Sequence, residues 1–67
     1  MGEIRVELKR ENDLGRRSYT ANNVLAALME HDIGYLFILH SDGEETIQSM
    51  DEISNLVVRG IEIQHAY

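Results

Sequence analysis

The chain of 67 residues contains no cysteine and no proline. Without cysteine it can form neither a disulfide framework nor a thiolate metal site, which are common reinforcements of small domains. The lack of proline, the absence of repeats and the presence of only five scattered glycines argue against a disordered linker. Because cysteine-free chains suit a reducing compartment, we expect a cytoplasmic protein.

Long apolar runs are also missing. No segment approaches the roughly 20 apolar residues that a membrane-spanning helix needs. The start, Met-Gly-Glu-Ile-Arg, lacks the apolar centre of a signal peptide. We therefore expect a protein without a membrane partner.

Positive charge is nearly absent from most of the chain. Residues 1–17 carry five bases and four acids, whereas residues 18–67 carry eight acids and only Arg59. Nearly all of the net charge of −6 therefore belongs to the last fifty residues. Such an acidic part suits either solubility or the binding of a basic partner.

The short length predicts a single domain, residues 1–67, of marginal stability. A chain of this size buries only about 60% of the surface that its unfolded form exposes. With neither disulfide nor thiolate metal site, self-association is the remaining reinforcement. We therefore expect a homo-oligomer, most simply a dimer.

The first half of the sequence predicts a strand and a helix. Residues 3–9 alternate between apolar and charged side chains, which is typical of a half-buried strand. Residues 10–19 show no apolar period and form either a long loop or a hairpin whose second strand is 16–19. Thr20 can cap a helix over residues 21–32, in which apolar residues recur at helical spacing up to Met29, and Gly34 can follow its end.

The second half predicts a hairpin, a short helix and a last strand. Asp42 and Gly43 favour a two-residue turn between strands 35–41 and 44–49. Ser49 and Glu52 have the spacing of a capping box, which predicts a helix that ends at Gly60. From Ile61 onwards the strand alternation resumes.

These elements give the order strand, helix, strand, strand, helix, strand. The expected fold is α+β, with a small, single-layer, mostly antiparallel sheet and two helices on one face, in the ferredoxin-like or split-βαβ order. An N-terminal hairpin at residues 3–19 would change this topology. Because residues 35–39 are apolar on both faces and two short helices cover only one, we expect Tyr35, Phe37 and Leu39 to lie in the core or at a self-association interface.

The sequence offers little support for catalysis or for a cofactor. His40, Ser41 and Asp42 are the residue types of a nucleophilic relay, but consecutive strand residues point to opposite faces. His31 is expected at a helix end, and His40 and His65 at strand ends, without the paired spacing of a metal site. We predict a non-enzymatic protein with no cofactor and no metal.

Interaction with another molecule remains as the function, and three versions are open. In the favoured one, an acidic surface binds and modulates a protein partner, as an inhibitor or as a mimic of nucleic acid. The residues expected to bind this partner are Asp42, Glu44, Glu45, Asp51 and Glu52.

The first alternative is nucleic-acid binding by the basic N-terminal strand and loop. It would use Arg5, Lys9, Arg10, Arg16 and Arg17. Interleaved acids such as Glu7 and Glu11 cancel much of the positive electrostatic potential of these five residues. The second alternative is a regulatory domain that binds a small ligand at the loop after the first strand.

Overall fold

The computed structural model describes all 67 residues and consists of six strands and one turn of 3₁₀ helix. The strands are β1 (Gly2–Leu8), β2 (Ser18–Glu30), β3 (Tyr35–His40), β4 (Glu45–Ser49), β5 (Ile53–Arg59) and β6 (Gln64–Ala66), and the 3₁₀ turn η1 (Met50–Glu52) joins β4 to β5. Strands account for 61% of the residues, and there is no α-helix.

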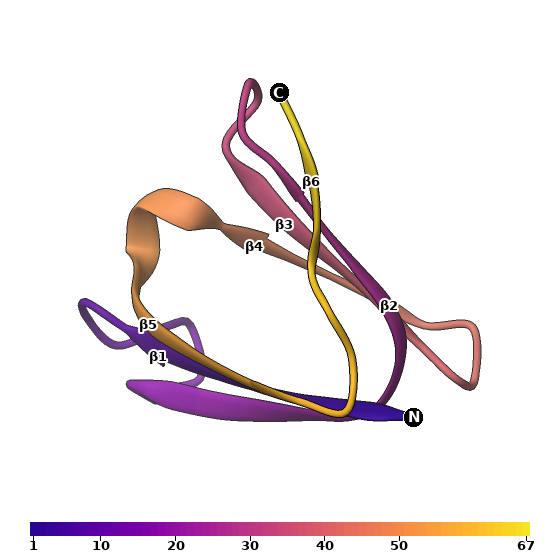
Figure 1. Ribbon diagram of the computed structural model, residues 1–67. Coiled ribbons are helices and arrows are strands. Elements are labelled where there is room, and N and C mark those ends of the chain that lie inside the picture. Colours follow the sequence, from indigo (N-terminus) through magenta and orange to yellow (C-terminus); the bar gives the residue numbers. More distant parts are fainter.

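The strands form one strongly bent sheet in the order β4-β3-β2-β1-β5, with β6 added parallel to β2. Figure 1 shows two layers that meet at an angle. One holds β1, β5 and the beginning of β2, and the other holds β3, β4, β6 and the rest of β2. The long strand β2 therefore belongs to both layers, and η1 bridges them on the opposite side.

The α+β fold predicted from the sequence is wrong, because the protein is all-β and does not have the ferredoxin-like order. The N-terminal hairpin variant is closer to the structure. β1 and β2 pair antiparallel, with Glu7 opposite Ser18, so the segment between them is a hairpin loop.

The predicted helix over residues 21–32 is instead most of β2. Two register shifts interrupt this strand, one against β1 between Ala21 and Val24 and one against β3 between Val24 and Ala26. Asn23 lies within the first shift and has a φ of 54°. As a result Ala21, Val24 and Ala27 are buried at intervals of three rather than two residues. An interval of three is close to the helical period, so the bulged strand looks like a helix in the sequence.

The second predicted helix is also wrong. Only the single 3₁₀ turn follows Ser49, whose side chain makes no capping hydrogen bond, and the chain continues as β5. β5 pairs antiparallel with β1. In this pairing the backbone amides and carbonyls of β5 find hydrogen-bond partners in another strand instead of within a short helix. β-Branched residues such as Ile53, Val57 and Val58 also favour a strand.

The β3–β4 hairpin confirms the prediction for this segment, with Phe37 opposite Ile47. Its turn differs from the one predicted. The amide of Gly43 donates to the carbonyl of His40 and that of His40 to the carbonyl of Glu44, so three residues rather than two make the turn. Within this turn Gly43 has a positive φ of 90°, whereas Asp42 does not have a positive φ.

The core lies on the inner side of the bend. Eight apolar residues from β1, β2 and β3 are buried there: Ile4, Val6, Leu8, Ala21, Val24, Ala27, Leu36 and Ile38. Residues of β5 and of the following segment, such as Leu56 and Ile61, pack against this group. No helix of the structure is long and apolar enough to span a membrane.

Candidate functional site

The outer face of β2, β3 and β4 carries an exposed apolar surface. Because directly paired strand residues point to the same face, the pairs Leu28–Phe37 and Phe37–Ile47 form one row across the three strands. Leu39 and Tyr35 lie on either side of Phe37 along β3. We call this surface the outer patch; its members are Ala26, Leu28, Tyr35, Phe37, Leu39 and Ile47.

Most of the large side chains of the outer patch are exposed, on the inner strands β2 and β3 as well as on the edge strand β4. Ile47 is 57% exposed, Tyr35 42%, Leu39 40% and Leu28 37%. Their neighbours Leu36 and Ile38 point the other way and are fully buried. The patch surrounds a shallow hollow of about 300 Å³ that also touches Glu45 of β4 and Gln64 of β6. Nothing in the chain covers this face.

The structure thus brings together the three residues predicted for self-association. Tyr35 and Phe37 lie in tilted contact, with ring centroids 6.5 Å apart, and Leu39 continues the same face of β3. Sequence analysis missed the contributions of β2 and β4, Leu28 and Ile47. Leu28 was assigned to a helix, and the exposure of Ile47 follows only from its pairing opposite Phe37.

The five acids predicted to bind a partner do not form one cluster. Asp42 and Glu44 lie in the β3–β4 turn and Glu45 begins β4, whereas Asp51 and Glu52 lie in η1 at its other end. The five residues of β4, about 16 Å of extended chain, lie between the turn and η1. Within the turn, Asp42 Oδ1 accepts the amide of Glu44 at 2.9 Å. One group of acids therefore lies at each end of β4, the strand that forms one edge of the outer patch.

The basic residues of the nucleic-acid alternative are also divided. Arg5 lies on the outer face of β1, where it donates to Ser18 Oγ at 3.2 Å and pairs weakly with Glu7 at 3.5 Å. The other four, Lys9, Arg10, Arg16 and Arg17, lie in the β1–β2 loop.

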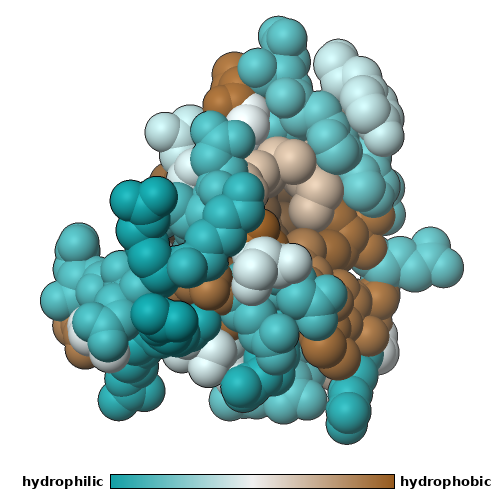
Figure 2. Space-filling model, turned by 90° about the vertical axis from the view of Figure 1, so that its left-hand side faces the viewer, coloured by the Kyte–Doolittle hydropathy of each residue, from teal (hydrophilic) through white to brown (hydrophobic).

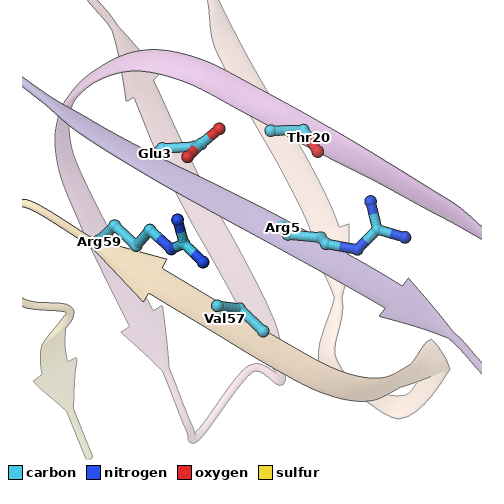
Figure 3. A pocket seen from close by; sticks show the side chains of 5 residues that line it. All are labelled: Glu3, Arg5, Thr20, Val57 and Arg59. Atoms are coloured by element: carbon cyan, nitrogen blue, oxygen red, sulfur yellow. The ribbon is translucent and has the colours of Figure 1, made fainter.

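Arg59, which is not among the bases predicted to bind nucleic acid, faces a hollow of about 220 Å³ together with Arg5 (Figure 3). Glu3, Thr20 and Val57 complete the lining, so a carboxylate shares the hollow with the two guanidinium groups.

The three histidines are hydrogen-bonded rather than free. His40 lies at the end of β3, where its Nε2 is 2.7 Å from Thr46 Oγ1, so it does not serve Ser41 or Asp42. His31 Nε2 and His65 Nδ1 are 2.7 Å apart, and the His31 ring stacks on Tyr67 with a centroid distance of 4.4 Å. The expectation that His31 ends a helix is wrong, because it follows a strand.

Tyr19 makes the main polar contact between the two layers. Its hydroxyl donates to Gln48 Oε1 at 2.7 Å, and burial raises the pKa of Tyr19 above 10.0. Gln48 is itself buried and donates from Nε2 to the carbonyl of Ser49.

We compared the chain with family models, curated proteins and solved structures. None of them matches. Figure 2 shows the side of the molecule on which η1 lies in Figure 1, and there hydrophobic residues form a continuous area among hydrophilic ones.

Proposed function

We propose that this protein is a non-enzymatic interaction module that binds a protein partner through the outer patch. The observation that carries the proposal is the row of exposed Leu28, half-buried Phe37 and exposed Ile47, which crosses three paired strands without a covering element. Contiguous apolar surface of this kind marks interaction sites in small soluble proteins. Burying these side chains supplies the apolar contribution to binding.

The acids beside the patch define the chemistry of the partner. Asp42, Glu44 and Glu45 lie at one end of β4, and Asp51 and Glu52 at the other. A partner with an apolar surface bordered by Lys or Arg would match both the outer patch and the acids at the two ends of β4. The apolar contacts would supply most of the affinity, and the acids would speed association and select against acidic proteins.

A second copy of the chain is the other candidate for the same face. The small core of eight buried apolar residues favours it, because a dimer would bury Tyr35, Phe37 and Leu39 as well. The two candidates differ in a simple measurement. Sedimentation of the purified protein gives a monomer if the face serves another protein and a dimer if it serves a second copy.

An aspartate in the outer patch should abolish partner binding. Ile47→Asp places a charge in the exposed row without entering the core, and Val57→Asp is the matched control on the outer face of β5, where Val57 is 37% exposed. The tagged wild type and both variants are used for capture from lysate. A stoichiometric protein is then purified and its dissociation constant measured with each form.

The proposal predicts that Ile47→Asp weakens this purified complex at least about 30-fold, as the loss of roughly 2 kcal/mol at an apolar centre implies. Val57→Asp should bind as the wild type does. Equal affinity of all three forms would contradict a binding role for the outer patch. Circular dichroism of both variants checks that the sheet is intact.

A further inference from the structure

The outer edge of β4 is unpaired. β4 pairs only with β3 and ends the order of strands in the sheet. The amide of His40 donates to the carbonyl of Glu44, and the amide of Met50 to that of Gly34, both at 2.9 Å. Since hydrogen-bonded pairs alternate along an antiparallel ladder, every second residue of β4 turns its backbone away from β3.

The residues with outward backbone groups are Glu45, Ile47 and Ser49. The amides of all three and the carbonyls of Glu45 and Ile47 point to the open side, whereas the carbonyl of Ser49 already accepts a hydrogen bond from Gln48 Nε2 at 3.0 Å. The side chain of Ile47 is 57% exposed, more than Leu28, Tyr35 or Leu39. The row from Leu28 through Phe37 to Ile47 therefore stops at an edge where another strand could continue it. Free backbone groups beside an exposed apolar side chain favour the addition of a strand.

We propose that β4 binds an extended segment of the partner by strand addition, and that this segment is apolar at its centre and carries Lys or Arg near both ends. The inference rests on the proposed function and specifies how the partner binds. The five residues of β4 fix the length of the added strand at about 16 Å. An apolar side chain beside Ile47 would extend the row, and the basic ends would meet the acids of the turn and of η1.

The charges decide against β4 of a second copy as the added strand. Antiparallel pairing of two β4 strands about Ile47 would place the turn acids of each copy beside the η1 acids of the other. Asp42 and Glu44 would then face like charges at both ends of the pairing, which opposes association. A segment with basic ends replaces these two repulsions with attractions.

The test is a titration with synthetic peptides followed by NMR. The binding peptide is Lys-Lys-Val-Thr-Val-Thr-Val-Lys-Lys, and the matched control replaces all four lysines with glutamate. A third peptide keeps the lysines and is N-methylated at alternate central residues, so that it cannot form the ladder. The proposal predicts slowed hydrogen exchange at the amides of Glu45, Ile47 and Ser49, with binding that weakens as salt increases.

We expect the glutamate peptide and the N-methylated peptide to bind at least about tenfold more weakly than the lysine peptide. Equal binding of the lysine and glutamate peptides, or unchanged exchange at the three amides under saturation, would overturn strand addition. Ile47→Thr keeps the backbone amide that faces the open edge of β4. Ile47→Pro removes this amide, and because the amide points away from β3, no hydrogen bond to β3 is lost. If Ile47→Pro folds, it should lose peptide binding.

The two proposals fail in different ways. If the captured partner is lost in Ile47→Asp but its complex leaves the exchange of the β4 amides unchanged, the outer patch binds by its face, and only strand addition is wrong. If Ile47→Asp retains the partner, the proposed function itself is wrong.

Discussion

At the residue scale, Tyr19 and Gln48 connect the two layers of the sheet. Tyr19 lies near the start of β2, and its hydroxyl donates at 2.7 Å to Gln48 of β4, which is only 9% exposed. Removing the hydroxyl would leave the buried Gln48 oxygen without this donor. An unsatisfied buried acceptor costs more than the bond itself contributes.

Tyr19→Phe should therefore lower the free energy of unfolding by about 1–2 kcal/mol. Urea denaturation followed by circular dichroism measures the change. Tyr35→Phe is the matched control, because Tyr35 is exposed and its hydroxyl makes no hydrogen bond within the chain. Equal loss in both variants would show that the Tyr19–Gln48 bond does not stabilise the fold.

The same tyrosine makes stability depend on alkaline pH. Burial raises the pKa of Tyr19 above its ordinary value of 10.0, so the folded state retains the phenolic proton when the unfolded chain has lost it. The contribution is fully present below pH 10.0 and is lost as the pH rises through the folded-state pKa. Tyr19→Phe should show a smaller loss of stability above that pH than Tyr35→Phe does.

At the element scale, β6 is the most weakly held strand. It has three residues, pairs only with the end of β2, and the amide of His31 donates to the carbonyl of Ala66 at 2.8 Å. The ring bond between His31 and His65 adds to this attachment. In this bond one of the two facing nitrogens donates and the other accepts.

Removing the ring bond should therefore loosen β6. His65→Ala deletes one of the two bonded rings and leaves the backbone bond of His31 possible. The amide of His31 should then exchange faster, relative to amides of β1, than in the wild type.

His65→Gln is the control for this effect, because its side-chain amide can still hydrogen-bond to the His31 ring. The increase in exchange should be smaller in this variant than in His65→Ala. Unchanged exchange in His65→Ala would show that the ring bond does not hold β6.

At the scale of the whole molecule, stability depends on very few buried side chains. Ile38 is fully buried in the middle of β3, whereas Leu25 of β2 is 52% exposed. Ile38→Ala should cost about 2–5 kcal/mol, which is a large part of the stability of so small a domain. We expect much of this variant to be unfolded at 25 °C.

Leu25→Ala should change the free energy of unfolding by less than about 0.5 kcal/mol. Ile38→Val, with an expected cost of about 0.5–1.5 kcal/mol, keeps the measurement possible if the alanine variant does not fold. Thermal and urea unfolding of the three variants provide the comparison. A small effect of Ile38→Ala would mean that the core is not on the inner side of the bend.

Local features that depend on neighbouring residues could be predicted from the amino-acid sequence. The alternation of residues 3–9 predicted β1, and Gly43 marked the hairpin between β3 and β4, although not its turn length. The face shared by Tyr35, Phe37 and Leu39 was likewise recognisable, because alternation along one strand fixes which side chains lie together.

Long-range pairing selected strand over helix in the rest of the chain. Alanine, leucine and methionine in β2 favour a helix locally, but β2 pairs with β1 over its first half and with β3 over its second half. The same long-range pairing placed Leu28 and Ile47 beside Phe37 and separated the acids into two groups along β4. These contacts join residues far apart in the sequence, so no local pattern of side chains could specify them.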